Sequence, residues 1–388
     1  MSYYPKPYFT RIINYDLLKT TKTMIRTLCS FLLLTTLGLS DINADKPYFV
    51  YGASATSQEV VSVKVEQKEC TPELKILQRL ELGFEAAPMV YHPDLKLLYI
   101  ASLRDKTGAG NKCAVLSTCS SGKLTLKKTV SFQHGSAYLS LDRTGKYLLS
   151  ASYFDGDVDI YHLDAEGIPS KRVHHQHEER DKAHAILTSP DNQFAYVPYV
   201  KNQNGLFQYK FEEKTGGLSS MDPHMTKLPS GIGPRHMAFH PSKPYLFFSN
   251  EQHQGASSFR VMPDGNLVLV DVEEAKGHEP ADGLMASDIY LTPNGQFLYV
   301  PVRDFGNGVQ DAIHAYRIHD DGTLTHIQKL PCDPIPWGLN VTADGRHLLL
   351  TAAKGNTLTF YAIAEDGTLK KQTHLEWGNM IRDIIILE

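Results

Sequence analysis

A short motif that recurs six times, at intervals of 47–52 residues, constrains the fold of this chain more than any other feature. Each copy begins with residues typical of tight turns and continues into a run rich in aromatic, β-branched and leucine side chains. The copies lie at residues 92–100, 142–150, 189–197, 240–248, 292–300 and 342–350. An internal period of this length is typical of repeat architectures, in which each unit packs against its neighbours.

A second series of turns runs in phase with the first and contains Gly122, Gly167, Gly216, Gly265, Gly322 and Gly367. Each of these turns follows another strand-like segment, such as the alternating residues 157–162 and 357–362. One unit of about 50 residues therefore contains four short strands, which is the pattern of a propeller blade. The Trp-Asp dipeptide of WD40 repeats is absent, and the units are longer than those repeats.

The two ends of the repeat region predict how the ring closes. Residues 46–54 match the second strand of a unit and lack a first strand, whereas residues 380–387 form a β-rich segment with no unit after it. Pairing the last strand with the first unit leaves no exposed sheet edge. Residues 45–388 divide into seven units of about 49 residues. We therefore expect an all-β fold: a seven-bladed β-propeller of four-stranded antiparallel blades, closed by the C-terminal strand.

The first 44 residues are expected to form an N-terminal extension with a signal peptide. Arg26 precedes the apolar run 28–39, and the small residue Ala44 follows it. This order is typical of a secretory signal, and the run is short against the roughly 20 apolar residues that span a bilayer. A buried helix or an uncleaved anchor is the alternative. A signal at about residues 24–44 predicts a periplasmic or secreted protein with no membrane association after cleavage.

Charge and cysteine content narrow the function further. The chain has 39 Lys and Arg residues against 43 Asp and Glu residues, and removing residues 1–44 changes the formal charge from −4 to −7. This balance argues against a nucleic-acid partner. The remaining cysteines, Cys70, Cys113, Cys119 and Cys332, form no paired C-x-x-C motif, so a structural zinc site is not expected. Their pairing stays open.

Five segments resemble the seven-bladed-propeller lactonase family, which includes bacterial 6-phosphogluconolactonases and fungal muconate-lactonizing enzymes. They are residues 89–94, 183–191, 233–241, 249–251 and 286–295, and the resemblance extends over essentially the whole chain from about residue 46. The family's proposed active site contains a histidine, two arginines and a glutamate. Matched motif by motif, the resemblance places these four catalytic roles on His184, Arg235, Glu251 and Arg303.

The positions of these residues in the repeat agree with a shared site. His184 and Arg235 precede the first turns of their units, so they belong to innermost strands that line the axial channel. Glu251 and Arg303 follow second-strand runs, so we expect them in loops at the channel mouth. The alternative for Arg235 and Glu251 is an ion pair that only joins neighbouring strands.

Lactone hydrolysis needs a base for the attacking water, donors for the oxyanion and an acid for the leaving oxygen. Glu251 or His184 is the candidate base, and His184 the candidate acid. Arg235 and Arg303 are candidates for stabilising the oxyanion or holding an anionic substrate group. The scheme requires no metal and no cofactor.

Four further residues are candidates for substrate binding. Asn250 precedes Glu251, and Asp288 lies in the matched segment 286–295, although a structural role in turns or channel hydrogen bonds is equally consistent. The family often has Pro-Arg-Gly-Phe-Asn where this chain has Trp337 in place of the arginine. Arg382, in the closing strand, is the candidate that restores the charge.

The histidine-rich segment 174–177, followed by Glu178 and Glu179, has the composition of a metal-binding tract. We interpret it as a solvated loop in the outer part of a blade, able at most to bind a metal adventitiously.

Two functions from different classes remain. The first is an exported lactonase that hydrolyses a small-molecule sugar-acid lactone. An exported enzyme is expected to meet an unphosphorylated lactone, because the phosphorylated sugars of central metabolism are cytoplasmic. The second is a non-catalytic propeller that binds carbohydrate or protein at the same mouth. The sequence leaves the oligomeric state open.

Overall fold

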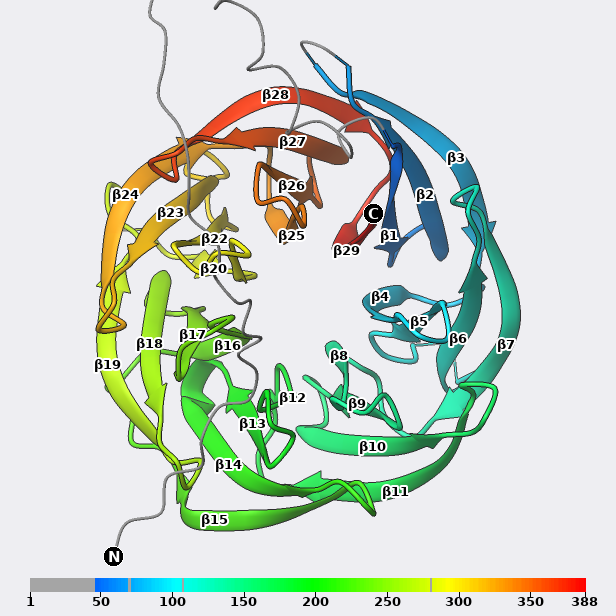
Figure 1. Cartoon of the computed structure of the whole chain (residues 1–388), viewed down its shortest axis with the longest axis vertical. Coiled ribbons are helices and arrows are strands. Elements are labelled where there is room, and N and C mark those ends of the chain that lie inside the picture. The colour runs from blue at the N-terminus through cyan, green and yellow to red at the C-terminus, as the bar shows by residue number, and fades with distance from the viewer. Residues whose placement is uncertain (1–45, 69–70, 107, 280) are drawn as a thin grey trace, which may run out of the picture. The chain divides into compact units, whose positions relative to one another are not determined.

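The computed structural model describes residues 46–68, 71–106, 108–279 and 281–388. Within these residues the strands form seven sheets arranged in a ring around a central axis (Figure 1). The expected seven-bladed β-propeller is therefore confirmed. The predicted signal peptide at about residues 24–44 lies outside the described residues. No helix among the described residues is long and apolar enough to cross a membrane.

Each blade has its innermost strand at the axis and its outermost strand at the rim of the ring. From the axis outwards, blade 1 contains β29 (Ile381–Leu387), β1 (Tyr48–Ser54), β2 (Glu59–Glu66) and β3 (Glu73–Glu81). Blade 2 contains β4 (Ala86–His92), β5 (Leu97–Ser102), β6 (Asn111–Thr118) and β7 (Leu124–Phe132). Blade 3 contains β8 (Tyr138–Leu141), β9 (Tyr147–Ala151), β10 (Asp157–Leu163) and β11 (Pro169–His177).

The remaining blades follow the same order. Blade 4 contains β12 (Leu187–Thr188), β13 (Phe194–Tyr199), β14 (Gly205–Glu212) and β15 (Gly217–Met225). Blade 5 contains β16 (Pro234–Phe239), β17 (Tyr245–Asn250), β18 (Gly255–Val261) and β19 (Leu267–Glu274). Blade 6 contains β20 (Leu284–Ala286) and β21 (Tyr290–Leu291), both paired with β22 (Phe297–Asp304), then β23 (Ala312–Ile318) and β24 (Leu324–Pro331). Blade 7 contains β25 (Pro336–Val341), β26 (His347–Ala352), β27 (Thr357–Ile363) and β28 (Leu369–Glu376).

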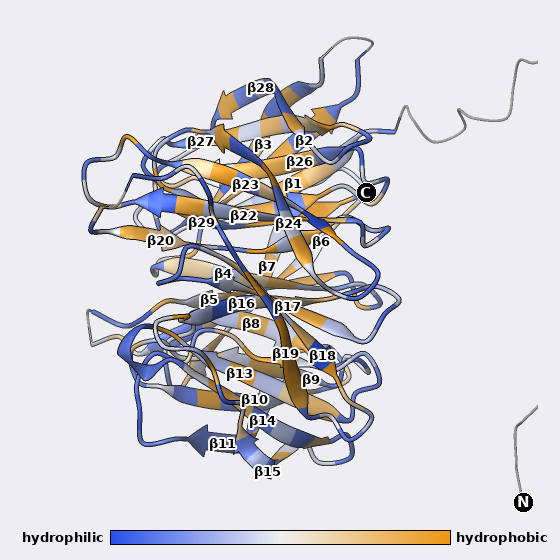
Figure 2. Cartoon of the chain, turned by 90° about the vertical axis from the view of Figure 1, so that its left-hand side faces the viewer, coloured by the Kyte–Doolittle hydropathy of each residue, from blue (hydrophilic) through white to orange (hydrophobic). Residues whose placement is uncertain are grey.

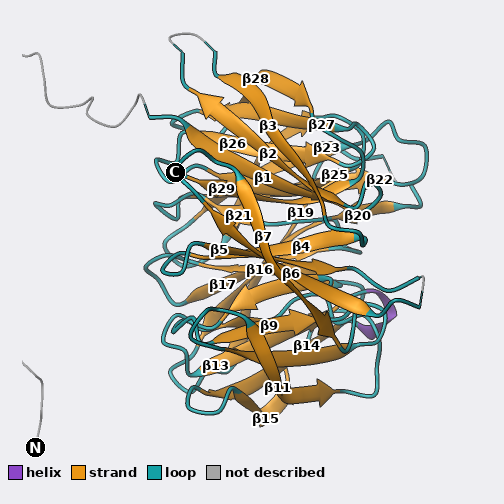
Figure 3. Cartoon of the chain, turned by 90° about the vertical axis from the view of Figure 1, so that its right-hand side faces the viewer, coloured by secondary structure: helices purple, strands orange, loops and turns teal. Residues whose placement is uncertain are grey.

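The C-terminal strand closes the ring as expected. β29 pairs antiparallel with β1, with Val50 opposite Ile386. The short 3-10 helix η1 (Lys201–Gln203) and the C-terminus lie at opposite faces of the ring (Figure 3). Apolar residues concentrate along the strands, and polar residues concentrate in the loops at both faces (Figure 2). The cores therefore lie between successive blades.

Tyrosines in second strands hold neighbouring blades together. The hydroxyl groups of Tyr99, Tyr196 and Tyr299 donate to the backbone oxygens of Gly167, Gly265 and Gly367, at 2.7, 2.7 and 3.0 Å. Each of these glycines belongs to the second turn series and lies in the next blade. The same hydrogen bond therefore joins a strand that follows a turn of the first series to a turn of the second series in the next blade.

The histidine-rich segment is not a solvated loop. Residues 174–177 belong to β11, the outermost strand of blade 3, which pairs with β10 over its whole length. The expectation that the segment lies in the outer part of a blade is confirmed. Cys113, Cys119 and Cys332 are free thiols, and Cys70 lies outside the described residues.

The seam between the first and last blades gives a stability prediction. Trp377 is fully buried there, and a Cβ atom added to Gly52 would collide with its indole ring. We expect Gly52→Ala to lower the free energy of unfolding by about 1–3 kcal/mol, because overpacking forces the seam to shift. Denaturant unfolding measures the change. Gly217→Ala is the control, because its Cβ atom meets only Thr215 and Glu212, both near the surface; an equal loss in both variants would contradict the argument.

Candidate active site

The innermost strands surround a cavity of about 730 Å³ that extends along the axis. This volume is within the range of small-molecule sites. Seven of the eight sequence-predicted residues line it: His184, Arg235, Glu251, Asp288, Arg303, Trp337 and Arg382. Lys201, in η1, also lines the cavity, so the cavity reaches the face of the ring that carries η1 (Figure 3).

Irregularities in the innermost strands bring these side chains to the axis. The register of β16 shifts between Pro234 and Met237, and that of β25 shifts between Pro336 and Leu339. The register of β29 skips Arg382, and residues 287–289 separate β20 from β21. A bulge re-aims a side chain that a regular strand would direct to one face of the sheet. Arg235, Asp288, Trp337 and Arg382 all lie at such interruptions.

The centre of the site is one carboxylate shared by two arginines. Glu251 Oε2 accepts from Arg235 Nε at 3.1 Å and from Arg303 Nη2 at 3.4 Å. All three side chains are buried. Arg235 Nη1 also donates to the backbone oxygen of Ser287 at 2.6 Å, and Arg303 Nη2 donates to that of Ala286 at 2.7 Å. Both guanidinium groups are therefore held in fixed orientations.

Each of these arginines keeps one terminal nitrogen for a ligand. Among the described residues, Arg235 Nη2 and Arg303 Nη1 have no hydrogen-bond acceptor. Burial, opposed by Glu251, lowers the pKa of Arg235. Burial and the charge of Arg235 lower the pKa of Arg303 to about 9, so it stays cationic at neutral pH. The cavity thus presents two preorganised cationic donors.

Trp337 forms a platform for three guanidinium groups. Its ring centre lies 4.5 Å from Arg303 Cζ, 4.6 Å from Arg382 Cζ and 5.9 Å from Arg235 Cζ. Guanidinium groups are attracted to the face of an indole at these distances. Arg382 therefore lies next to the position where the family pattern has an arginine and this chain has Trp337. The Nε atom of Arg382 is buried and has no hydrogen-bond partner among the described residues.

His184 lies against the same cluster in its neutral form. Its ring makes edge contacts with Tyr153 and His236, at centroid distances of 5.5 and 5.0 Å. Burial, and then the positive charge of Arg235, lower the pKa of His184 well below the ordinary value of 6.5. A neutral imidazole beside two fixed cations can accept a proton but does not carry a resting charge.

The sequence interpretation missed His236 and Asp383, which line the cavity together with the predicted Asp288. His236 Nδ1 lies 2.7 Å from Asp288 Oδ1, and Asp288 Oδ2 accepts from the backbone nitrogen of Leu339 at 3.2 Å. Burial opposes ionisation of Asp288, but the facing His236 and Arg235 keep its pKa below the ordinary value. Asp383 accepts from the backbone nitrogen of Met89 at 2.8 Å, and burial together with the charge of Asp288 raises its pKa to about 7. His236 follows Arg235, and Asp383 follows Arg382, so adjacency to a matched residue was the available signal.

Three predicted placements differ from the structure. His184 lies in the segment before β12, next to the isolated bridge residue Ala183, and not within an innermost strand. Arg303 is the penultimate residue of β22 rather than part of a loop, whereas Glu251 directly follows β17 as expected. Asn250 is fully buried inside blade 5, where its Oδ1 accepts from Ser257 Oγ at 2.9 Å, and it is absent from the cavity lining. Asn250, the last residue of β17, is therefore buried inside the blade, whereas Glu251 lines the cavity.

The charges of the cavity favour an anionic ligand at the η1 face. Arg235, Arg303, Arg382 and Lys201 line the cavity there, and Glu251 is the carboxylate shared by the first two. Arginine forks bind carboxylates and phosphates through paired hydrogen bonds. The arrangement can hold an anionic group and stabilise developing negative charge on a second oxygen.

The chain is similar to known proteins in sequence and in structure. The chain matches the family described as "Lactonase, 7-bladed beta-propeller" over residues 49–380. It is 28% identical over 326 residues to a 6-phosphogluconolactonase of Cronobacter sakazakii, covering 83% of this chain and 93% of that protein. It is 29% identical over 322 residues to the 6-phosphogluconolactonase of Pectobacterium atrosepticum, covering 81% of this chain and 90% of that protein. The solved structure of a periplasmic gluconolactonase of Pseudomonas aeruginosa superposes with a TM-score of 0.79 at 19% identity, covering 88% of this chain and 99% of that one.

Proposed function

The chain belongs to the lactonase family of seven-bladed β-propellers, and we propose that it hydrolyses the lactone of a sugar acid. The observation that carries this proposal is the convergence of His184, Arg235, Glu251 and Arg303 on one cavity. The names of the relatives from Cronobacter and Pectobacterium support a lactone as the substrate class.

In the proposed reaction, the arginines stabilise the charge that develops on the carbonyl oxygen. The oxygen of water bonds to the lactone carbonyl carbon, and the carbonyl oxygen becomes an oxyanion. Arg235 Nη2 and Arg303 Nη1 are the donors for this oxyanion, because their other nitrogens are already committed to fixed partners. Such preorganised donors do not need to reorient during the reaction.

We assign His184 as the general base. Glu251 Oε2 is engaged by two guanidinium groups, and its Oε1 accepts from Gln252 Nε2 at 3.1 Å, so Glu251 serves mainly to position the arginines. Neutral His184 takes the proton from water as the carbon–oxygen bond forms. The bond between the carbonyl carbon and the ring oxygen then breaks, and the resulting imidazolium returns the proton to that ring oxygen. A low pKa makes His184⁺ a strong acid for this second step.

Arg382 and Trp337 are proposed to bind the part of the substrate remote from the reacting carbonyl. Arg382 is a cation for a phosphate or carboxylate, and the Trp337 face is a surface for the sugar ring. These two contacts would orient the carbonyl toward Arg235 and Arg303.

Arg382→Gln is expected to raise KM for 6-phosphogluconolactone by about 10-fold, because a charge-assisted contact contributes about 1.5 kcal/mol or more. KM for uncharged gluconolactone should change less than about twofold. Steady-state kinetics on both substrates measure the ratio. An equal effect on the two lactones, or none on either, would remove Arg382 from anion recognition.

The function itself is tested by a panel assay on the purified protein. Gluconolactone, 6-phosphogluconolactone and muconolactone are compared against spontaneous hydrolysis, with Arg303→Met as the site variant and exposed Glu376→Gln as the control. Turnover that depends on Arg303 and not on Glu376 supports a lactonase. No turnover above the spontaneous rate on any lactone would favour the alternative, a binding propeller for carbohydrate or protein.

We further propose that the protein acts in the periplasm or outside the cell, on the basis of the sequence of residues 24–44. Cell fractionation with detection of the processed chain tests this location. Recovery of the unprocessed chain in the cytoplasm would overturn it and would make phosphorylated lactones the more accessible substrates.

A further inference from the structure

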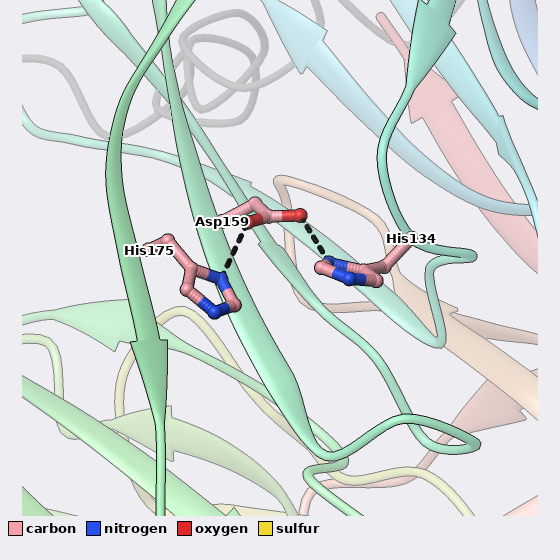
Figure 4. A group of neighbouring side chains, drawn as sticks. All are labelled: His134, Asp159 and His175. Carbon is pink, nitrogen blue, oxygen red and sulfur yellow. Dashed lines mark hydrogen bonds and ion pairs between the residues drawn. The ribbon is translucent and has the colours of Figure 1, made fainter.

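The outer half of blade 3 contains a cluster of three histidines and two aspartates that lies outside the cavity lining. Asp157 and Asp159 alternate along β10 and point to the same side. His177 and His175 lie directly opposite them on β11, in register. His134 enters from the segment between β7 and β8, so three parts of the chain meet at one place. Figure 4 shows the central three side chains, with Asp159 between the two imidazoles.

Asp159 orients two of the imidazoles. Its Oδ2 lies 2.8 Å from His134 Nδ1, and its Oδ1 lies 3.1 Å from His175 Nδ1 (Figure 4). Asp159 is almost fully buried, whereas the two imidazoles are partly exposed. When an imidazole donates through Nδ1, its Nε2 atom carries the free lone pair. This is the carboxylate–histidine arrangement that typically surrounds a bound metal ion.

The freed nitrogens face the second carboxylate. His134 Nε2 and His175 Nε2 each lie 3.5 Å from an oxygen of Asp157, and His177 Nδ1 lies 3.0 Å from Asp157 Oδ1. Around a tetrahedral zinc ion with bonds of about 2.0–2.1 Å, neighbouring ligand atoms are roughly 3.3–3.4 Å apart. Each of the three nitrogens therefore lies within about 0.4 Å of this spacing from one oxygen of Asp157, His134 from Oδ2 and the other two from Oδ1. His134, Asp159 and His175 also have potential ligand atoms that all lie within 4.8 Å of one another.

We propose that blade 3 binds a divalent transition-metal ion, with zinc as the best fit, through His134 Nε2, His175 Nε2, His177 Nδ1 and a carboxylate oxygen of Asp157. Asp159 is the positioning residue. Imidazole nitrogens and carboxylate oxygens are ordinary zinc ligands, and four protein donors make a closed, structural site. The ion would tie the β7–β8 segment to the outer strands.

The local charges favour a cation. Arg172 Nη1 donates to Asp159 Oδ1 at 3.0 Å and balances that carboxylate. Asp157 has only imidazole partners among the described residues, so with neutral histidines one negative charge remains for the ion. The side chains of His175 and His177 are 40% and 43% exposed, which leaves a path from solvent.

Blade 7 shows that the fold does not require this cluster. There Thr357 and Thr359 take the places of Asp157 and Asp159, and His374 lies opposite Thr359 as His175 lies opposite Asp159. Asp333, two residues beyond the end of β24, accepts from the Thr357 and Thr359 hydroxyls at 2.9 Å each. One carboxylate and two hydroxyls are thus enough to join an entering segment to the outer strands. Blade 3 has two carboxylates and three imidazoles at the corresponding positions.

A second group of histidines, in blade 6, is the main competing location. His314 Nε2 lies 2.8 Å from His278 Nε2, and His314 Nδ1 lies 2.9 Å from His326 Nε2. His314 contacts its two neighbours through different ring nitrogens, so the three imidazoles form a chain and do not converge on one point. The group does provide a useful control.

The test uses the protein without a polyhistidine tag, stripped with a chelator and dialysed. Zinc is titrated by calorimetry, and bound zinc is counted by elemental analysis after gel filtration. We expect one equivalent of zinc. Asp157→Asn and His175→Ala should weaken binding at least tenfold, and Asp159→Asn by about 10–100-fold. His374→Ala and His326→Ala are the matched controls and should bind as the parent does.

Two further measurements keep the result interpretable. Circular dichroism establishes that each variant folds, and cobalt(II) replaces zinc to report ligand geometry through its visible absorption. Asp159→Asn should alter that spectrum while one equivalent of cobalt still binds at high cobalt concentration. Loss of the folded site would instead abolish cobalt binding. Saturating zinc should raise Tm by roughly 5 °C in the parent and not in His175→Ala. Binding only at millimolar zinc (an adventitious ion only), binding unchanged in Asp157→Asn and His175→Ala, or binding lost in His326→Ala would each overturn the proposal.

Discussion

Replacing Glu251 with glutamine is expected to lower the free energy of unfolding by about 3–5 kcal/mol, because the change leaves two buried arginines without their counter-charge. Glu251 is 4% exposed, Arg235 is 1% exposed and Arg303 is 3% exposed. Glutamine keeps the volume of glutamate, so no cavity forms and the loss is electrostatic. Urea unfolding followed by tyrosine fluorescence measures the difference, and hydrolysis should fall as the guanidinium groups move apart.

The control for this variant is Glu376→Gln on β28, where the side chain is exposed and the expected change is within about 0.5 kcal/mol. A second variant separates charge from shape: Arg303→Met combined with Glu251→Gln removes one of the stranded cations and should recover part of the lost stability. If Glu251→Gln is as stable as the parent, the arginines do not depend on Glu251 for their charge balance. Glu251 would then be a better candidate than His184 for the general base.

The ring could be predicted from the sequence because its determinants are local and repeated. Each turn at positions such as Pro190 or Gly265 ends a strand within a few residues, and six copies of one signal leave little choice of register. Closure by residues 381–387 followed from counting strands at the two ends. The same counting placed Arg235 in the innermost strand of its blade, because the first strand of each unit had to be the innermost one. His184 lines the cavity from the segment that precedes β12.

The shape of the site could not be predicted in the same way. It depends on register shifts at Arg235, Trp337 and Arg382, and on the gap in the inner strand at Asp288. A bulge is a compromise between strand pairing and packing around the axis, and neither is visible in a single segment. The pairing of His236 with Asp288 joins blades 5 and 6 across 52 residues, and no local pattern encodes it.

The histidine-rich strand was misread for a related reason. A strand is recognised by apolar residues on alternate positions. In β11 the alternate residues His175 and His177 lie opposite Asp159 and Asp157 and are partly exposed, so this face of the strand is polar and the usual signal is missing. The sequence of such a polar strand therefore resembles that of a loop until its partner strand is known.

His184→Ala is expected to lower kcat by about 10²–10⁴-fold with little change in KM, which is the usual effect of removing a general acid–base group. The proposed reaction needs one group that takes a proton from water and returns it to the ring oxygen, and we assign both steps to neutral His184. Single-turnover and steady-state rates measure the change, with exposed His374→Ala as the control. A loss of less than about tenfold would contradict the assignment.

The pH profile distinguishes His184 from the other titrating groups of the cavity. His184 must be neutral to accept a proton, so activity is full above its pKa and falls as the pH drops through it. Because burial and Arg235 lower that pKa well below 6.5, we expect kcat/KM to stay level through pH 6.5 and to fall only in more acidic buffer. The pKa of Asp383 is raised to about 7, so its ionisation could make kcat/KM fall near neutral pH. If that fall disappears in Asp383→Asn and persists in His184→Ala, Asp383 and not His184 controls the pH profile. An acidic limb that His184→Ala abolishes while Asp383→Asn retains it would identify the proton that the reaction uses.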